Sequence, residues 1–311
     1  MIYITGATGH IGNNVVREFI KNDTPCELLL RKLGKAIEGL PVLSHIGDIF
    51  HDDFLKSHLK SGDVLIHCAG VIDLTKRLKD ESTFVNIQGT FTIVDFCVEN
   101  HIRLIYVSSV DAINKPKNSD PIFEPNAFDL SKIKSHYAKA KAEGTAYVQD
   151  KINQGLLKGA IVYPSAVIGV HDYKPSAAGH EIMKASRKKI LPYIRGGYNF
   201  IDVRDCAKAI HALTVTNQEG SYILAAHEHT IKEFYQMIAK ISNQNKILIG
   251  FPRFIAKFGA LFFKDISNVM IDAVQENYHY VNQRMVKHLK VEPIPFEETV
   301  RDTIEWFQNQ Q

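Results

Sequence analysis

Cysteine is scarce in this chain of 311 residues, and its four copies form no recognisable pattern. Cys26, Cys68, Cys97 and Cys206 show neither a CxxC pair nor the spacing of a metal site, and two of them fall inside apolar runs. We therefore expect buried free thiols rather than disulfides or metal ligands, as in proteins of a reducing compartment. The sequence predicts a cytoplasmic location.

An excess of one charge and long apolar runs are also lacking. The formal net charge is +3, with Lys and Arg scattered along the chain, which argues against a nucleic-acid partner. No apolar run reaches the roughly 18–20 residues of a membrane span, and no charged leader precedes the first apolar segment. An apolar content of 45% and a charged content of 23% are typical of a globular protein, and the length allows between one and two domains.

The first twelve residues combine an apolar run with three glycines. The segment MIYIT leads to Gly6, Gly9 and Gly12, after which Val15 and Phe19 recur at helical spacing. This pattern is typical of a strand, a tight turn and a helix whose free N–H groups favour an anion. We therefore predict that a dinucleotide pyrophosphate binds there. The alternative is a turn whose glycines serve only its geometry.

The following residues alternate apolar strands with amphipathic helices. We expect strands at 28–30, 42–46, 64–70, 104–107 and 160–163, and helices at about 81–99 and 133–152. Nearly continuous apolar strands joined by helices indicate a parallel sheet covered on both faces. The predicted fold class is α/β, a doubly wound parallel sheet of the Rossmann type with a smaller, mainly helical C-terminal substrate domain.

Proline and glycine become frequent after residue 165. The segment Asn199–Asp202 has the pattern of a strand returning to the sheet, followed by a helix that Asp205 caps, and Thr230 is a cap in the remaining, mostly helical part. We expect a dinucleotide-binding domain of residues 1–165, to which 199–225 return, and a smaller substrate-binding domain of 166–198 and 226–311. The ligand site is then expected in the cleft between them, at the carboxyl ends of the strands.

Three side chains suggest proton chemistry. Tyr137 and Lys141 are four residues apart in a predicted helix and therefore share one face. Lowering a phenol pKa by about three units takes about 4 kcal/mol, part of which a nearby ammonium could supply. Ser109 ends a strand at the expected cleft, where its hydroxyl could hydrogen-bond a substrate carbonyl. The alternatives are a solvated helix face and an ordinary turn serine.

Several motifs, in their order and spacing, resemble the extended short-chain dehydrogenase/reductase superfamily. Within it the chain is similar to NAD(P)-dependent epimerase/dehydratase and dihydroflavonol-reductase-like members. The motifs are Thr5-Gly6-x-x-Gly9-x-x-Gly12, Gly47-Asp48-Ile49, 86–90, Tyr106-Val107-Ser108-Ser109, Tyr137-x-x-x-Lys141, Pro164-Ser165, 196–205 and 296–306. The chain departs from the sugar-nucleotide epimerases at 110–113, and a nucleotide-sugar-binding portion is not recognisable.

The resemblance implies a catalytic set and a cofactor site. Tyr137 would be the general acid/base, Ser109 would polarise the carbonyl, and Lys141 would bind the nicotinamide ribose and lower the Tyr137 pKa. Asn86 matches an asparagine that serves either in a proton relay or as a structural residue of the helix. The expected cofactor contacts are Gly6, Thr8, Gly9, His10, Ile11 and Gly12, Arg31 and Lys32, Asp48 and Ile49 at the adenine, Cys68, Ala69 and Gly70, and Lys141, Tyr163, Pro164 and Ser165.

The residues after the second strand indicate which cofactor binds. An acidic residue there would bind the ribose 2′-hydroxyl of NAD, whereas Leu30 is followed by Arg31 and Lys32, with Lys35 nearby. Because a guanidinium can hold a phosphate in a bidentate fork, we expect NADP rather than NAD. The alternative is a solvated basic loop.

Apolar positions near the expected centre favour an apolar substrate. They are Val71, Ile72, Val110, Val167 and Ile168, and no cluster of Arg or Asn suggests a diphosphate-sugar clamp. The sequence predicts an NADP-dependent oxidoreductase that transfers hydride reversibly to an apolar or aromatic aldehyde or ketone. The alternatives are a nucleotide-sugar epimerase or dehydratase and a non-catalytic, NADP-sensing regulatory protein.

Two other features are expected to be structural. His227 and His229 favour a loop pair over a metal site because no carboxylate-rich pattern accompanies them. Residues 254–263 favour a core or subunit contact over a membrane-surface patch, which makes a homodimer one of the expectations.

Overall fold

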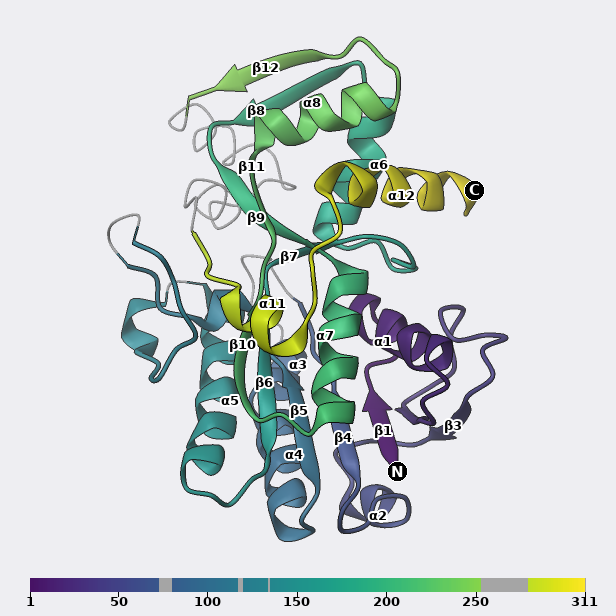
Figure 1. The fold of residues 1–311 in the computed structure, drawn as a ribbon, viewed down its shortest axis with the longest axis vertical. Coiled ribbons are helices and arrows are strands. Elements are labelled where there is room, and N and C mark those ends of the chain that lie inside the picture. The colour runs from purple at the N-terminus through teal and green to yellow at the C-terminus, as the bar shows by residue number, and fades with distance from the viewer. Residues whose placement is uncertain (73–79, 117–119, 134, 253–278, 311) are drawn as a thin grey trace.

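The computed structural model describes residues 1–72, 80–116, 120–133, 135–252 and 279–310 (Figure 1). Residues 254–263, expected to form a core or subunit contact, lie outside the described residues. A large sheet with its helices forms the lower part of Figure 1, and a smaller unit lies above the ends of its strands.

A seven-stranded sheet is the framework of the larger part, in the order β10-β6-β5-β4-β1-β2-β3. Each neighbouring pair of its strands is parallel, as expected for nearly continuous apolar strands. The strand order reverses beside β1, which has β2 on one side and β4 on the other, and such a reversal opens a crevice at the carboxyl ends. The strands are β1 (Ile2–Thr5), β2 (Glu27–Leu30), β3 (Leu43–Ile46), β4 (Val64–His67), β5 (Arg103–Val107), β6 (Gly159–Pro164) and β10 (Gly220–Leu224).

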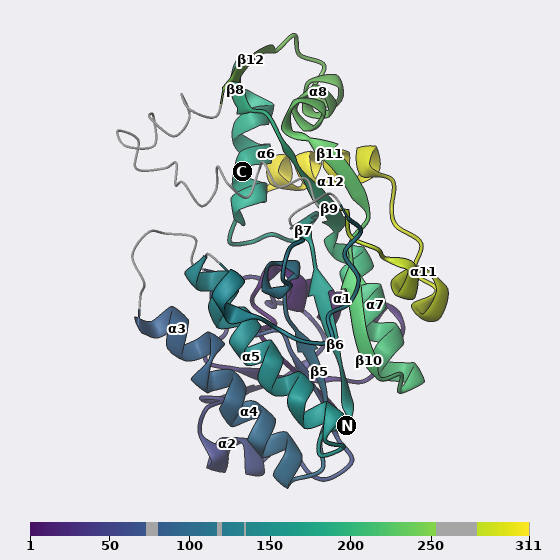
Figure 2. The same ribbon diagram turned by 90° about the vertical axis from the view of Figure 1, so that its left-hand side faces the viewer.

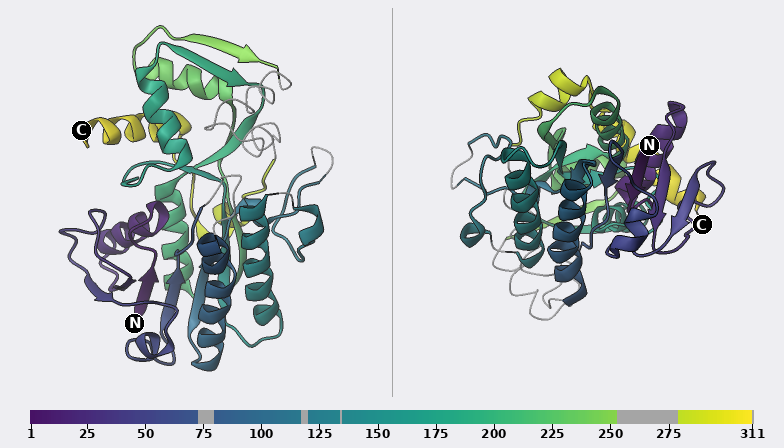
Figure 3. Two further views of the ribbon diagram at one scale, coloured as in Figure 1. Left: turned by 180° about the vertical axis from the view of Figure 1, so that it is seen from behind. Right: turned by 90° about the horizontal axis from the view of Figure 1, so that it is seen from below.

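Helices cover both faces of this sheet, so the predicted fold class is confirmed (Figures 2 and 3). One face packs against α1 (His10–Lys21), α7 (Val203–Thr216) and α11 (Gln283–Leu289), and the other against α2 (Asp52–Lys56), α4 (Gln88–Glu99) and α5 (His136–Asn153). The helix expected at 81–99 is divided into α3 (Asp80–Asn86) and α4, which Ile87 separates. Alternate residues of β6 enter the two cores, as the pleat of a strand requires.

The described part of the smaller unit contains three helices together with short strands, which supports its expected helical character in part. Its core lies between two small sheets and three helices. These elements are β7 (Ala166–Ile168), β9 (Gly197–Asp202) and β11 (His227–Thr230) in one sheet, β8 (Ile190–Ile194) and β12 (Ile247–Phe251) in the other, and α6 (Ala177–Arg187), α8 (Ile231–Ile241) and α12 (Phe296–Asn309). Thr230 caps α8 with a reciprocal capping box, as its pattern predicted.

Two expectations for the segment after residue 198 are wrong. The strand at 199–202 does not return to the large sheet, because β9 pairs with β7 and β11, and the strand that returns is β10. The cap of the next helix is Asp202 rather than Asp205, since the Asp202 carboxylate accepts the Arg204 N–H at 2.8 Å. Asp205 lies one turn on, where it accepts the backbone N–H of Ile294 at 2.8 Å.

Candidate active site

The glycine turn after β1 brings the start of α1 close to the loop after β4. Gly6 has φ 71°, and a Cβ on it would lie 2.5 Å from the backbone nitrogen of Ala69. A Cβ on Gly12 would lie 2.8 Å from the carbonyl carbon of Gly6. Gly9 is the N-cap of α1 and makes no side-chain cap, so the first N–H groups of the helix remain available to an anion. The turn therefore fits a diphosphate.

The loop after β2 lies directly against this turn. A Cβ on Gly34 would lie 3.5 Å from Cγ2 of Thr8, and the Asn13 side chain donates to the carbonyl of Ala36. Arg31 and Lys32 are exposed at the beginning of the loop. The loop that begins with these two cationic residues thus lies beside the glycine turn, on the side where an adenosine 2′-phosphate would extend from the diphosphate.

Lys141 lies buried at the other end of the crevice, below the end of β5. Its side chain is 5% exposed, and Nζ donates to the carbonyl oxygen of Val107 at 3.2 Å and lies 5.2 Å from the centre of the Tyr106 ring. A Cβ on Gly70 would come within 3.1 Å of Nζ, so the absence of a side chain there leaves the ammonium room. Burial, and then the Lys141 charge, lowers the pKa of His67 to about 3, which keeps that imidazole neutral.

Tyr137 lies one helical turn before Lys141, with Ser109 as its neighbour. Burial raises the pKa of the Tyr137 phenol above its ordinary range, and the charge of Asp111 and the proximity of Tyr106 raise it further, whereas a hydrogen bond with Ser109 lowers it. Lys141 is not among these causes, and its ammonium donates to the carbonyl of Val107. The raised pKa means that the phenol keeps its proton at neutral pH.

The two serines after β5 have different roles. Ser108 is buried and hydrogen-bonds the hydroxyl of Thr145 at 2.6 Å, which fixes the end of β5 against α5. Ser109 is half-buried, and its Oγ accepts the N–H of Asp111 at 3.1 Å. Since that oxygen is already an acceptor, the hydroxyl proton of Ser109 is oriented away from the turn and can be donated to the phenol or to a substrate oxygen.

Asn86 braces the loop after β4. Its Nδ2 donates to the carbonyl of Val71 at 2.7 Å, and its Oδ1 accepts the N–H of Val71 at 3.1 Å. The residue is 2% exposed and lies where α3 ends. Because both ends of the amide are occupied by one backbone unit, the geometry favours the structural role over a proton relay.

The end of β6 offers a polar atom to a ligand. The Oγ of Ser165 is buried and has no hydrogen-bond partner in the described part of the chain. An unsatisfied buried hydroxyl is uncommon, and the amide of a nicotinamide group would satisfy it. The Tyr163 side chain, in contrast, is fully buried in the core on the α4 and α5 face, so only its backbone can face a cofactor.

Three other residues expected to contact the cofactor, His10, Asp48 and Ile49, make contacts within the protein. The His10 ring is hydrogen-bonded to the carbonyl of Val170 at 3.0 Å, and burial lowers its pKa, so this side chain ties α1 to the smaller unit. Asp48 accepts the N–H of Phe50 at 3.0 Å within its own turn, and Ile49 is buried beside it.

The apolar residues expected around the substrate are divided by the structure. Val110 and Ile168 belong to the hydrophobic cores and do not face the crevice. Val167 packs against the core of the large sheet, whereas Val71 is half-buried and Ile72 is 71% exposed. The expected apolar wall is therefore reduced to the loop after β4.

Two interactions near the site were not predicted from the sequence. Thr5 and His67 form a buried hydrogen bond of 2.9 Å between β1 and β4, directly beneath the glycine turn. Asp111 affects the Tyr137 phenol through its charge. The only sign of Asp111 was the departure at 110–113 from the pattern of the sugar-nucleotide epimerases.

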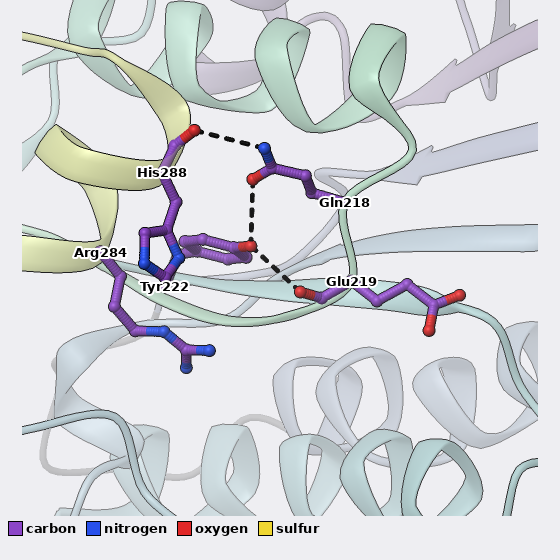
Figure 4. A pocket seen from close by; sticks show the side chains of 5 residues that line it. All are labelled: Gln218, Glu219, Tyr222, Arg284 and His288. Atoms are coloured by element: carbon purple, nitrogen blue, oxygen red, sulfur yellow. Dashed lines mark hydrogen bonds between the residues drawn. The ribbon is translucent and has the colours of Figure 1, made fainter.

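The described surface also has a shallow depression far from this crevice (Figure 4). It lies at the amino end of β10, where the Gln218 side chain accepts from the Tyr222 hydroxyl at 3.3 Å and donates to the His288 carbonyl at 3.2 Å. The carboxyl ends of the strands, which carry the candidate active site, are at the opposite edge of the sheet. We do not assign this depression to the site.

The described residues contain no group of three His, Cys, Asp or Glu side chains that could hold a metal ion. Both histidines lie in β11 rather than in the expected loop: the His227 ring donates to the carbonyl of Ile294 at 2.7 Å, and the His229 ring stacks on Phe296 with their centroids 4.0 Å apart. Within the same described part, no helix has the length and apolar character that a membrane crossing needs.

Comparison with known proteins connects this geometry with a group of nucleotide-dependent enzymes. A model of the NAD dependent epimerase/dehydratase family matches residues 2–225. A putative dihydroflavonol 4-reductase of Synechocystis sp. is 26% identical, over 99% of this chain and 94% of the relative. Sterol demethylase protein B of Methylococcus capsulatus is 25% identical, over 80% of this chain and 76% of the relative.

Solved structures share the fold over their whole length. The structure of gox2253 superposes with a TM-score of 0.87 at 22% identity and covers 100% of this chain and 98% of the other. UDP-glucose 4-epimerase of Thermus thermophilus, in complex with NAD, has a TM-score of 0.76 at 17% identity, covering 100% and 99%. RMD from Pseudomonas aeruginosa, complexed with NADPH, has a TM-score of 0.74 at 18% identity, covering 99% of each chain.

Proposed function

Because the chain belongs to the NAD dependent epimerase/dehydratase family, we propose that it is a reductase that uses NADP to reduce an apolar or aromatic aldehyde or ketone, reversibly. The observation that supports the proposal best is the pairing of the Tyr137 and Ser109 hydroxyls at the carboxyl edge of the sheet, one helical turn from the buried Lys141. These are the groups that a carbonyl reduction requires, namely a proton donor, a hydrogen-bond donor and a cation.

The residues present fit a nicotinamide dinucleotide. The glycine turn and the start of α1 would hold the diphosphate, Lys141 the nicotinamide ribose, and the orphan Ser165 hydroxyl the nicotinamide amide. When bound in its reduced form, the cofactor supplies the hydride. Arg31 and Lys32 support NADP over NAD because a 2′-phosphate beside the turn would meet two cations and, at the end of β2, no carboxylate.

The chain's own groups would handle the proton. Ser109 would donate its hydroxyl hydrogen to the substrate's carbonyl oxygen and so stabilise the negative charge that develops there during reduction. Tyr137 then transfers its phenolic proton to that oxygen, and the alcohol forms. Since the Tyr137 pKa is raised, the phenol carries this proton at neutral pH, which favours the reducing direction.

Other features support the remaining parts of the proposal. Dihydroflavonols and sterols, after which the two relatives are named, are ring compounds with large hydrocarbon frameworks, which supports a substrate of that kind. The four cysteines are free thiols, which supports a reducing, cytoplasmic compartment.

The direct experiment follows NADPH absorbance with a panel of aldehydes and ketones, and in parallel with UDP- and dTDP-sugars. We expect oxidation of NADPH with apolar or aromatic carbonyls and its loss by a factor of about 10² or more in Tyr137→Phe, which keeps its affinity for NADPH. Conversion of a nucleotide sugar at constant absorbance, without reduction of any carbonyl, would favour an epimerase or dehydratase. Tight NADPH binding with no turnover in either panel would favour a sensor.

A further inference from the structure

The turn that follows Ser109 carries a carboxylate to the edge of the candidate active site. Val110–Ala112 form the 3-10 helix η1, which packs on α5, the helix of Tyr137. Val110 and Ala112 are buried, so Asp111 between them is fixed in place, and its N–H is bound to the Ser109 hydroxyl at 3.1 Å. The Asp111 side chain itself is exposed.

The Asp111 carboxylate has no hydrogen-bond or ion-pair partner in the part of the chain that the structure describes. Lys115, a lysine four residues further on, donates instead to the carbonyl of Val110. The turn that carries Asp111 packs on the helix of Tyr137, and the charge of Asp111 raises the pKa of the Tyr137 phenol and also that of Tyr198. A negative charge in the site is thus left for a ligand to meet.

Tyr198 belongs to the other unit of the molecule. It lies on β9, which is above the carboxyl ends of the large sheet, and its side chain is half-buried (Figure 1). Asp111 therefore lies where the two units meet, with the proton-donating Tyr137 on one side and a phenol of the smaller unit within reach. A substrate bound to Ser109 and Tyr137 would extend past this carboxylate.

We propose that Asp111 is a specificity-determining residue, which accepts a hydrogen bond from a hydroxyl group that the substrate carries beyond its carbonyl, and which disfavours an anionic group at the same place. The inference rests on the proposed reductase function and narrows its substrate class to hydroxylated apolar carbonyl compounds. A hydroxyl is favoured because a carboxylate only accepts hydrogen bonds, and bonds to an ionised acceptor are about twice as strong as neutral ones. An anionic group at the same place would be repelled by the like charge of the carboxylate.

The test compares benzaldehyde with its 3-hydroxy and 3-carboxy derivatives, in the wild type, Asp111→Asn and Asp111→Ala. We expect the wild type to prefer the 3-hydroxy over the 3-carboxy compound by about tenfold in kcat/KM, and Asp111→Ala to reduce this ratio severalfold. Asp111→Asn keeps an acceptor without the charge, so it should recover the 3-carboxy compound and retain part of the preference for the 3-hydroxy compound. Asp120→Asn, an exposed acid nine residues further on, is the matched control and should keep the wild-type ratio.

Binding separates the two proposals. The corresponding benzyl alcohols are titrated calorimetrically into the NADP-loaded protein, where the same selectivity is expected without turnover. Equal 3-hydroxy to 3-carboxy ratios in the wild type and Asp111→Ala, in rate or in affinity, would overturn the role of Asp111 and leave the reductase function standing. Selective binding that depends on Asp111, without oxidation of NADPH by any carbonyl, would support the recognition role and refute the reductase.

Discussion

Removing the Asn86 side chain should weaken the fold and the cofactor site together. Both ends of the amide bind the backbone of Val71, at 2.7 Å and 3.1 Å, in a buried position. A net contribution of about 0.5–1.5 kcal/mol for each hydrogen bond predicts that Asn86→Ala lowers the free energy of unfolding by about 1–3 kcal/mol. At about 2 °C per kcal/mol for a chain of this size, Tm should fall by about 2–6 °C.

The effect on the cofactor follows from the position of the loop. Val71 comes directly after Gly70, and a Cβ on Gly70 would lie 3.1 Å from Nζ of Lys141 and 3.3 Å from Oδ1 of Asn86. When the brace is lost, the loop that limits the position of the ammonium is released. We therefore expect the Kd for NADPH to rise severalfold, whereas kcat at saturating cofactor should fall by less than about tenfold because Tyr137 and Ser109 stay in place.

Thermal unfolding and NADPH fluorescence titration measure the two effects. The matched control is Asn114→Ala, because Asn114 clamps the backbone of Asp129 in the same manner, at 2.8 Å and 2.7 Å. It should lower Tm similarly and leave the Kd for NADPH unchanged. An Asn86→Ala protein with an unchanged Tm and a kcat reduced by about 10² would refute this reasoning and establish the proton relay.

Three further outcomes test the site. Arg31→Asp should weaken NADP binding by about tenfold and strengthen NAD binding, and equal affinities of the wild type for the two would contradict the expected preference. Because burial raises the Tyr137 pKa, the phenol stays protonated below that raised value, and the rate of carbonyl reduction should be nearly constant from about pH 6 to 9 while the rate of alcohol oxidation rises about tenfold per pH unit. A reduction rate that halves near pH 7 would rule this out. Gly12→Ala should lower the Tm of the cofactor-free protein, because the added Cβ would lie 2.8 Å from the Gly6 carbonyl carbon. Gly9→Ala should leave the Tm unchanged, because its Cβ would lie 3.2 Å from the Gly6 oxygen, and equal Tm values for the two variants would argue against this packing role.

The sequence was sufficient for the large sheet because its strands are apolar on both faces. Such apolar runs can be recognised from neighbouring residues, so the strands and their parallel arrangement can be predicted without knowledge of distant contacts. The smaller unit was predicted less well, since β9 pairs with β7 and β11 through residues 27 to 34 positions apart, in short segments interrupted by Gly and Pro. Pattern alone could not decide that β10 rather than 199–202 returns to the sheet.

The candidate site shows the same division. That Ser109 and Tyr137 come together was foreseeable, because parallel strands end at one edge and a helix repeats its face every fourth residue. The burial of Val110 and Ile168 was not, since an apolar residue beside a catalytic one can face either the core or the ligand. The influence of Asp111 on two phenols also escaped prediction, because it acts through space between elements that the sequence does not connect.

The chain passes repeatedly between its two units, and this limits how it can be divided. After β10 it enters the smaller unit, yet α11 comes back to the large sheet, where Met285 is fully buried and Leu289 is 5% exposed. Asn282, just before α11, donates to the carbonyl of Ala225 at 2.7 Å. A fragment that ends at residue 225, where the family match stops, would therefore leave part of the nucleotide-binding core open to solvent. The unit that holds the nucleotide is completed only by a segment that follows the smaller unit in the chain, so neither unit is an independent module for expression or for exchange between relatives.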